Sequence, residues 1–282
     1  MSKVAVVGAG TMGNGIAHVF AQHGWDVTLV DIEPEALERA LNTISTNIER
    51  LVKKNAGSRE QGAATLARIA TSTKLDAAKD AEIVVEAASE NPKIKFDIFT
   101  ALSRLVPPST VLASNTSSIS ITEIAKHTDR PSKVIGMHFM NPVPLMPLVE
   151  VVRGQETGDG LVARVVEIAK ELGKTPVVVN DAPGFVSNRV LMPMINEAIL
   201  CVQEGIATAE AVDQVMTLGM KHPLGPLALA DLIGLDVCLA ILEVLQEGFG
   251  DIKYRPARLL KEMVASGRLG RKSGVGFYVY RD

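Results

Sequence analysis

The sequence predicts an α/β fold, with a mostly parallel sheet covered by helices and followed by a smaller all-helical domain. Apolar strand-like runs alternate with helix-like runs over the first two thirds of the chain. That alternation ends at the turn-forming cluster Asn180–Gly184. We therefore expect one domain over residues 1–184 and a second over 185–282, and the total of 282 residues suits two domains.

The first strand and the turn after it carry the most specific pattern in the chain. The strand-like run Val4–Val7 is followed directly by Gly8-Ala9-Gly10-Thr11-Met12-Gly13, and a helical apolar face comes next. Gly8 permits a tight turn, Gly10 lets the backbone approach a pyrophosphate, and Gly13 lets the helix pack close to the strand. The start of the helix favours negative charge. This segment is therefore predicted to bind a dinucleotide.

Asp31 ends the second strand-like run, residues 25–30, and lies 18 positions after Gly13. A carboxylate at about 20 residues from the glycines accepts hydrogen bonds from the adenosine ribose hydroxyls. It would repel a 2′-phosphate, so NAD is predicted in preference to NADP. The alternative is that Asp31 caps the helix predicted over 34–54, with Pro34 in its first turn.

The remaining elements follow from hydrophobic periodicity. Strands are predicted at 82–87, 110–114, 133–138, 147–152 and 175–179, and helices near 92–105, 120–126 and 160–172. Beyond residue 184, helices are predicted at 185–204, 208–218, 226–247 and 256–266, the first bent at Pro193. The segment 226–247 is apolar on nearly every side, so we expect it in a core or, by preference, at a dimer contact.

Composition excludes several classes of function. The chain is 47% hydrophobic and 22% charged with a net charge of −3, which is ordinary for a globular enzyme and gives no basic patch for nucleic acid. The most apolar stretch, 223–242, contains two aspartates, so no membrane span is expected. Cys201 and Cys238 lack metal-type spacing and indicate a reducing compartment, the cytoplasm. No targeting segment is predicted, because the first strand starts by residue 4.

His138 is the best-placed candidate for catalysis among the five histidines. It ends the strand-like run 133–138, and ligands of open α/β sheets bind at the carboxyl ends of strands. If this strand pairs antiparallel with the next about Pro144, residue 138 faces Glu150. Such a carboxylate would fix the tautomer of the histidine and stabilise its imidazolium, so the pair is interpreted as a general base and its partner. The alternative is a structural pair at a sheet edge.

Several motifs occur in the order and spacing of one family. They are Gly8–Gly13, Asp31, Ser114–Ser118, His138–Pro142, Leu148–Val151, Pro183–Arg189 and Gly274–Tyr278. With these motifs the chain resembles the L-3-hydroxyacyl-CoA dehydrogenases, including the bacterial 3-hydroxybutyryl-CoA enzymes, over nearly its whole length. The resemblance implies a Rossmann-like first domain, an all-helical second domain used for homodimerisation, and an active site between them. It also implies NAD-dependent oxidation of an acyl-CoA substrate, within fatty acid metabolism.

The resemblance further implies roles for individual residues. His138 would be the general base and Glu150 its partner, while Ser117 and Asn188 would bind substrate oxygens. The positions that match cofactor contacts of the family are Glu90, Lys95, Ser117, Asn141 and Lys272. Without the resemblance, Lys95 is a solvated helix charge, Ser117 a turn hydroxyl and Lys272 a tail residue.

The CoA site follows the family pattern only in part. Lys54 matches a lysine that contacts CoA, although a cation at a helix end also compensates the helix dipole. Asn47 stands where the family has a serine, which departs from the pattern.

Two other functions stay open at this point: a dehydrogenase of a free hydroxy acid, of the gulonate type, and a non-catalytic NAD-binding protein, as crystallin relatives are. Acyl-chain length and pathway, whether fermentation, fatty-acid breakdown or aromatic-acid breakdown, stay open too.

Overall fold

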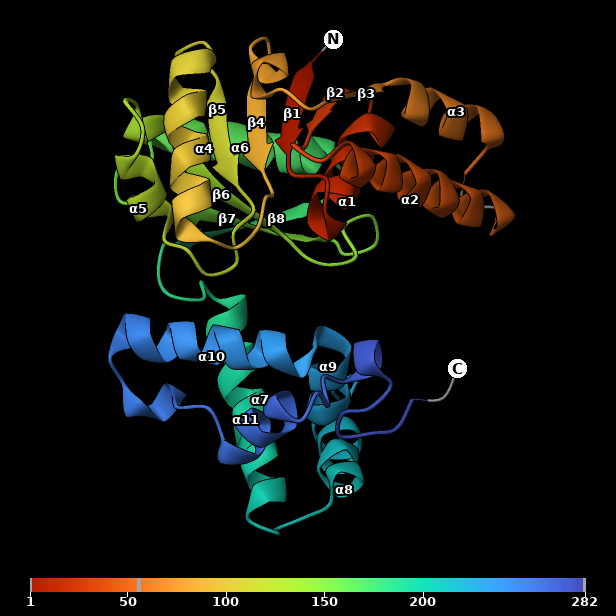
Figure 1. Ribbon diagram of the computed structural model, residues 1–282, viewed down its shortest axis with the longest axis vertical. Coiled ribbons are helices and arrows are strands. Elements are labelled where there is room, and N and C mark those ends of the chain that lie inside the picture. Colours follow the sequence, from red (N-terminus) through yellow and green to blue (C-terminus); the bar gives the residue numbers. More distant parts are fainter. Residues whose placement is uncertain (1, 55–56, 281–282) are drawn as a thin grey trace. The chain divides into compact units, whose positions relative to one another are not determined.

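A computed structural model describes residues 2–54 and 57–280 and divides the chain into two compact units between Ala182 and Pro183. The division falls within the turn-forming cluster 180–184. Figure 1 shows the α/β architecture of the first unit and the helices of the second.

The first unit is built on one eight-stranded sheet in the order β3-β2-β1-β4-β5-β6-β7-β8. Its strands are β1 (Lys3–Val7), β2 (Asp26–Val30), β3 (Ile69–Ser72), β4 (Ile83–Glu86), β5 (Val111–Ser114), β6 (Val134–Phe139), β7 (Leu148–Arg153) and β8 (Thr175–Asn180). Pairing is parallel from β3 to β6, antiparallel between β6 and β7, and parallel again between β7 and β8. The predicted α/β fold with a mostly parallel sheet is confirmed.

Helices cover both faces of the sheet. They are α1 (Thr11–Gln22), α2 (Pro34–Lys53), α3 (Arg59–Ala67), α4 (Pro92–Leu105), α5 (Ile121–Lys126) and α6 (Asp159–Glu171). One apolar core packs α1, α2 and α6 against the sheet, whereas α4 lies on the face opposite α6 and α5 contacts both α4 and β6. Because side chains alternate along a strand, Ile83 and Val85 enter that core and Glu86 points to the face of α4.

α3 and β3 are two elements that hydrophobic periodicity does not predict. The only buried residues of α3 are Gly62 and Thr65, so the helix has no apolar periodicity to detect. It starts instead with a capping box, in which Ser58 Oγ accepts from the Gln61 N–H at 3.1 Å and Gln61 Oε1 accepts from the Ser58 N–H at 2.9 Å. β3 is a short strand at the edge of the sheet.

The second unit is helical, as predicted. Its elements are α7 (Ser187–Gln203), α8 (Ala209–Gln214), a π-helical turn (Val215–Gly219), α9 (Pro226–Ile233), α10 (Leu235–Phe249) and α11 (Arg258–Ala265). Pro193 lies inside α7. Within the described residues, no helix combines the length and the apolar character that crossing a bilayer requires.

The prediction of one helix over 226–247 is wrong. Gly234 has a φ of 105°, which favours glycine, and it ends α9 and begins α10. Leu227, Leu235 and Leu242 are fully buried in the core of this unit. The segment 226–247 is apolar on nearly every side mostly because it forms two helices, α9 and α10, which both pack into one core.

Candidate active site

The glycine-rich turn has the geometry that the pattern predicts. Gly8 has a φ of 106°, and its N–H donates to the Val30 carbonyl oxygen at 2.7 Å. A Cβ at Gly13 would overlap the carbonyl oxygen of Gly8, so the close approach of helix and turn requires glycine at position 13, while a Cβ at Gly8 would overlap the backbone of Ala87. A Cβ at Gly10 would meet no atom within 4 Å. Packing within the chain therefore does not require glycine at position 10. A residue without a side chain there is consistent with a ligand that approaches the backbone.

Asp31 lies beside this turn. Its Oδ2 accepts from the Ala9 N–H at 2.7 Å, and its Oδ1 accepts from the Glu33 N–H at 3.0 Å. The N-cap residue of α2 is Glu33. Asp31 is therefore not the cap residue of the next helix, and its carboxylate stands at the carboxyl end of β2 next to the glycines, where a ribose would bind.

His138 and Glu150 are directly paired across β6 and β7, which confirms the antiparallel pairing predicted about Pro144. His138 Nδ1 lies 2.8 Å from Glu150 Oε2, and both side chains are almost fully buried. With Nδ1–H donating to the carboxylate, the neutral ring carries its lone pair on Nε2. The arrangement can take a proton at Nε2 and stabilise the resulting imidazolium.

The polar side chains near the carboxyl ends of the central strands share one face of the sheet. Glu86 and Ser114 are register partners in β4 and β5. Neighbours of Glu86, Ser114, His138 and Glu150 on their own strands enter the α1 core, so alternation points all four of these side chains to the opposite face.

Glu90 organises the loop that contains Ser117. Its Oε1 accepts from Thr116 Oγ1 at 2.6 Å, from the Ser117 N–H at 2.9 Å and from the Ser118 N–H at 3.0 Å, and both serine hydroxyls contact the same oxygen. Burial raises the pKa of Glu90, but the charge of Lys95 and these hydrogen bonds outweigh it, and the net pKa is below its usual value. The loop is thus held by an ionised carboxylate.

The same loop is tied to the strand that carries His138. Asn115 Oδ1 accepts from the Phe139 N–H at 2.9 Å, and this bond is buried. The Ser117 loop and the end of β6 are therefore linked next to the histidine.

Lys95 is not a solvated helix charge. Its side chain is 1% exposed, and Nζ lies 2.7 Å from Glu86 Oε1 and 3.3 Å from Glu90 Oε2. The lysine belongs to an internal ion-pair cluster beside the Ser117 loop, and its direct contact with a cofactor stays a prediction.

Asn141 lies exposed in the loop between β6 and β7. Lys174 Nζ donates to the carbonyl oxygens of Val143 and Met146 at 2.6 and 2.8 Å, which fixes this loop. Burial lowers the pKa of Lys174. The loop that carries Asn141 is therefore held by a lysine from the turn before β8.

The other predicted residues belong to α7, to the segment after α11 and to α2. Asn188 is buried in the first turn of α7, and Lys272 pairs with Asp236, with 2.5 Å between Nζ and Oδ1. Lys54 is exposed at the C-terminal cap of α2, and Asn47 is partly buried on the same helix.

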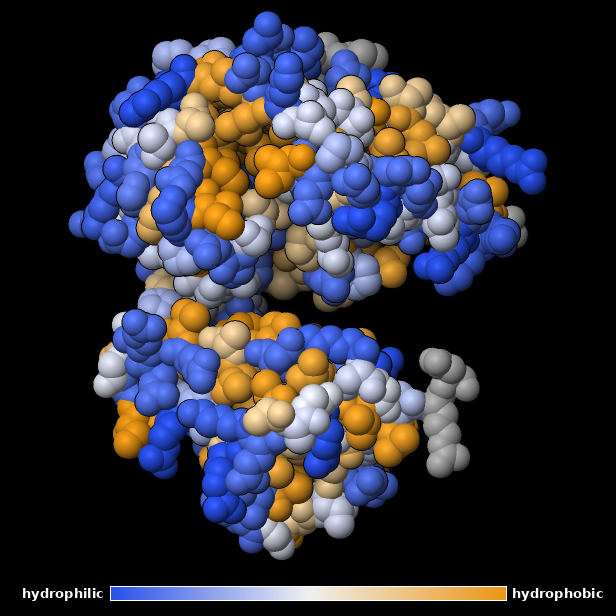
Figure 2. Space-filling model, viewed as in Figure 1, coloured by the Kyte–Doolittle hydropathy of each residue, from blue (hydrophilic) through white to orange (hydrophobic). Residues whose placement is uncertain are grey.

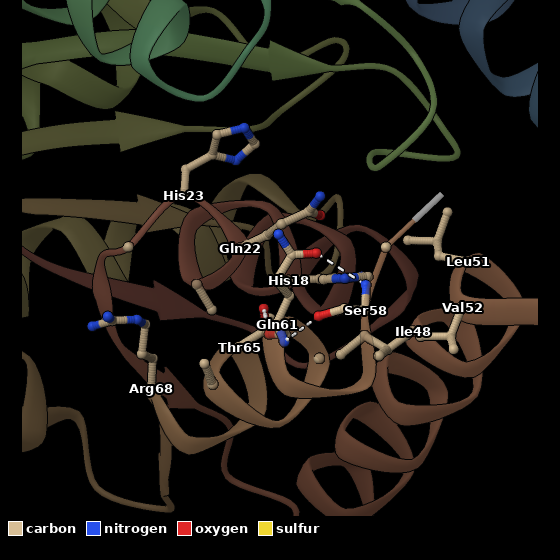
Figure 3. Close-up of a pocket in the computed structure, with 15 residues that line it drawn as sticks. His18, Gln22, His23, Ile48, Leu51, Val52, Ser58, Gln61, Thr65 and Arg68 are labelled. Atoms are coloured by element: carbon tan, nitrogen blue, oxygen red, sulfur yellow. Dashed lines mark hydrogen bonds between the residues drawn. The ribbon is translucent and has the colours of Figure 1, made fainter. Parts of the chain in front are cut away.

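A cavity of about 400 Å³ lies among α1, α2 and α3 (Figure 3). Its lining includes His18, Gln22, Ile48 and the capping-box residues Ser58 and Gln61, and it contains none of the predicted site residues. Over residues 2–54 and 57–280, no cluster of three or more histidine, cysteine, aspartate or glutamate residues could hold a metal ion.

Sequence reasoning missed Glu86, Asn115 as a link to β6, and Lys174. The signal for Glu86 was present, because it is a carboxylate at the end of the otherwise apolar run Ile83–Val85. The same kind of signal, one carboxylate in an apolar strand, pointed to Glu150. Contacts of Asn115 and Lys174 depend on the fold of loops, which periodicity does not report.

Comparison with known proteins gives a consistent result over both units. The family model "3-hydroxyacyl-CoA dehydrogenase, NAD binding domain" matches residues 3–182, and the model "3-hydroxyacyl-CoA dehydrogenase, C-terminal domain" matches residues 184–280. A probable 3-hydroxybutyryl-CoA dehydrogenase from Bacillus subtilis (strain 168) is 53% identical over 282 residues, which cover 100% of this chain and 98% of the relative.

Solved structures are similar too. A crystal structure of (S)-3-hydroxybutyryl-CoA dehydrogenase from Ralstonia eutropha has a TM-score of 0.96 and 50% identity, with 100% of each chain covered. A diketoreductase structure has a TM-score of 0.88 and 32% identity, with 99% of each chain covered.

Proposed function

Because the chain belongs to the 3-hydroxyacyl-CoA dehydrogenase family and begins with that family's NAD-binding domain, we propose that it interconverts L-3-hydroxyacyl-CoA and 3-ketoacyl-CoA with NAD(H). We propose 3-hydroxybutyryl-CoA as the substrate, since the relatives from Bacillus subtilis and Ralstonia eutropha carry that name and align over the whole chain.

The His138–Glu150 pair is the observation that carries the proposal. His138 takes the proton of the C3 hydroxyl at Nε2, and Glu150 holds the ring through Nδ1 and stabilises its positive charge. The Gly8–Gly13 turn and Asp31 would hold NAD, which would supply the acceptor for the hydride of C3. In the reductive direction, the protonated His138 returns the proton to the C3 oxygen.

Two further groups would orient the substrate. Ser117 stands in a loop fixed by Glu90, so its hydroxyl is suited to hold a substrate oxygen or the nicotinamide end of the cofactor. Asn188 would hold the reacting oxygen or the acyl carbonyl, a role proposed from its position in the family motif.

NAD would be held at the carboxyl ends of β1 and β2. The backbone of the Gly8–Gly13 turn and the start of α1 suit the pyrophosphate, and the Asp31 carboxylate suits the ribose. Glu90, Lys95, Asn141 and Lys272 are proposed as further cofactor contacts on the family pattern, and Lys54 as a contact of the CoA part.

We also propose a homodimer formed through the helical unit. Large apolar side chains are exposed on this unit, among them Val190, Val215, Leu218 and Met220, and Figure 2 shows hydrophobic residues interrupting its hydrophilic surface. The cytoplasm is the proposed compartment, because both cysteines are free thiols. A role in fatty acid metabolism is proposed on the family resemblance alone.

The test is an NADH-consumption assay that compares acetoacetyl-CoA with free acetoacetate. Turnover with the thioester and little turnover with the free acid is expected. A preference for acetoacetate would favour a dehydrogenase of a free hydroxy acid. A simple dicarbonyl compound is assayed as well, because the similar diketoreductase is named for acting on such compounds. Tight NADH binding without turnover of any acyl-CoA would favour a non-catalytic protein.

A further inference from the structure

Five residues beside the Ser117 loop close into a ring of hydrogen bonds and ion pairs, here called the Glu86 ring. Its members are Glu86, Lys95, Glu90, Thr116 and Ser114. Lys95 Nζ bridges the two glutamates, Ser114 Oγ donates to Glu86 Oε2 at 2.6 Å, the Thr116 N–H donates to Ser114 Oγ at 3.2 Å, and Thr116 Oγ1 donates to Glu90 Oε1 at 2.6 Å.

Glu86 is the most enclosed member. Its side chain is 0% exposed, and its carboxylate accepts from Lys95 Nζ at 2.7 Å, from Ser114 Oγ and from the Ala88 N–H at 2.7 Å. Both carboxylate oxygens of Glu86 are bound by groups of this chain, so Glu86 would act on the chemistry through these partners.

Stability gives a weak reason to bury this ion pair. Removing a carboxylate and an ammonium from water is costly, and apolar replacements of similar volume are often as stable. What the pair does provide is fixed geometry, because each charge accepts or donates bonds in several set directions.

The Glu86 ring joins three segments whose relative positions matter for the proposed reaction. Glu86 ends β4, Lys95 lies on α4, and Ser114 ends β5 and leads into the Ser117 loop. Beyond the ring, Glu90 binds the backbone and hydroxyl of Ser117, and Asn115 of the same loop binds the Phe139 N–H next to His138.

We propose that Glu86 is a positioning residue for the dehydrogenase reaction, which holds the Ser117 loop and the adjoining end of β6 through Lys95 and Ser114. The inference rests on the proposed function. Glu86 would then support the residues that contact substrate and cofactor without contacting either ligand itself.

The main variant is Ser114→Ala, which breaks the ring by removing one hydroxyl. Thr110→Val is the matched control, since Thr110 Oγ1 also makes a buried hydrogen bond, 2.8 Å to the Ala81 carbonyl oxygen, immediately before the other end of β5. Glu86→Gln is a second variant that keeps the shape of the side chain and removes its charge. Each is compared with the wild type in thermal unfolding, NADH affinity by fluorescence titration, and kcat and KM with acetoacetyl-CoA.

Ser114→Ala and Glu86→Gln are expected to weaken NADH binding several-fold and to lower kcat by about tenfold or more, because small displacements of reacting groups have large effects on rate. Thr110→Val is expected to keep kcat and NADH affinity. If Glu86→Gln does not fold, Ser114→Ala decides. Equal kinetic effects of Ser114→Ala and Thr110→Val would overturn the inference, because they would reduce the ring to a general structural role.

The NADH titration needs no turnover. If the wild type does not act on acetoacetyl-CoA, the proposed function fails, and a selective loss of NADH affinity in Ser114→Ala still supports the positioning of the loop. If the wild type is active and Ser114→Ala is unchanged in both kcat and NADH affinity, the positioning role fails and the function stands.

Discussion

His138 Nδ1 and Glu150 Oε2 lie 2.8 Å apart in directly paired positions of β6 and β7. Two neighbouring strands of one sheet fix this distance, so it does not depend on a mobile loop. A histidine held in this way presents its second ring nitrogen in a defined direction, which a general base requires.

His138→Gln is expected to lower kcat by about 10²- to 10⁴-fold, because the variant has no group to take the hydroxyl proton. NADH affinity should stay close to that of the wild type. Steady-state NADH oxidation with acetoacetyl-CoA measures the first quantity and fluorescence titration the second. His127→Gln, at an exposed histidine, is the control. Wild-type turnover in His138→Gln would rule out the base assignment.

Asp31→Ala is expected to weaken NAD binding far more than NADP binding. The variant loses the acceptor for the ribose hydroxyls, and it also loses the charge that repels a 2′-phosphate. Dissociation constants for both cofactors measure the effect. Because Asp31 also accepts from the Ala9 N–H, thermal unfolding is recorded beside them. An equal loss for NAD and NADP would show that the carboxylate only supports the turn.

Lys54→Ala is expected to raise KM for acetoacetyl-CoA roughly three- to tenfold, as the loss of one exposed charge-assisted hydrogen bond would. The KM for a truncated thioester that lacks the nucleotide part of CoA should not change. Lys53→Ala, at the neighbouring exposed lysine, is the control. A change for both thioesters would argue against a contact with the CoA tail.

His18 should make the first unit sensitive to mild acid. Its side chain is 1% exposed, Nδ1 has no hydrogen-bond partner, and burial lowers the pKa to about 4. The unfolded chain binds this proton near pH 6.5, so the free energy of unfolding falls as the pH drops from about 6.5 towards 4, by about 3 kcal/mol from this group.

The measurement is urea unfolding at pH 7, 6 and 5 for the wild type, for His18→Leu and for His23→Gln, which changes an exposed histidine near the same helix end. His18→Leu should lose part of the acid sensitivity, and His23→Gln should retain it. The same pH dependence in all three proteins would exclude His18 as the cause.

Leu218→Glu should shift the protein from dimer to monomer if the helical unit forms the contact, because the leucine is 82% exposed on the π-helical turn of that unit. Light scattering after size-exclusion chromatography gives the mass. Leu145→Glu, at an exposed leucine of the first unit, is the control. A monomeric wild type, or a shift only in Leu145→Glu, would contradict the proposed contact.

Much of the fold and the central pair could be predicted because the signals are local and periodic. The β1 turn carries its glycines in sequence order, and the pairing of His138 with Glu150 follows from their equal distance from Pro144 once the strands are antiparallel. The carboxyl end of β6 then selects one histidine out of five.

Other features depend on contacts that no local pattern contains. Lys95 has the spacing of a surface lysine, and only the packing of α4 on β4 brings it to Glu86. Gly234 stands within a continuous apolar pattern, so the break between α9 and α10 is set by a positive φ and not by polarity. Residues 59–67 form a helix without an apolar stripe, which hydrophobic periodicity cannot detect.

The reversal of direction between β6 and β7 has a consequence for how the His138–Glu150 pair is assembled. Both partners come from one hairpin, so closing a short loop is enough to bring imidazole and carboxylate together, at a small entropic cost. The pairing of β5 with β6 then brings this hairpin next to the Ser117 loop, which binds the end of β6 through Asn115.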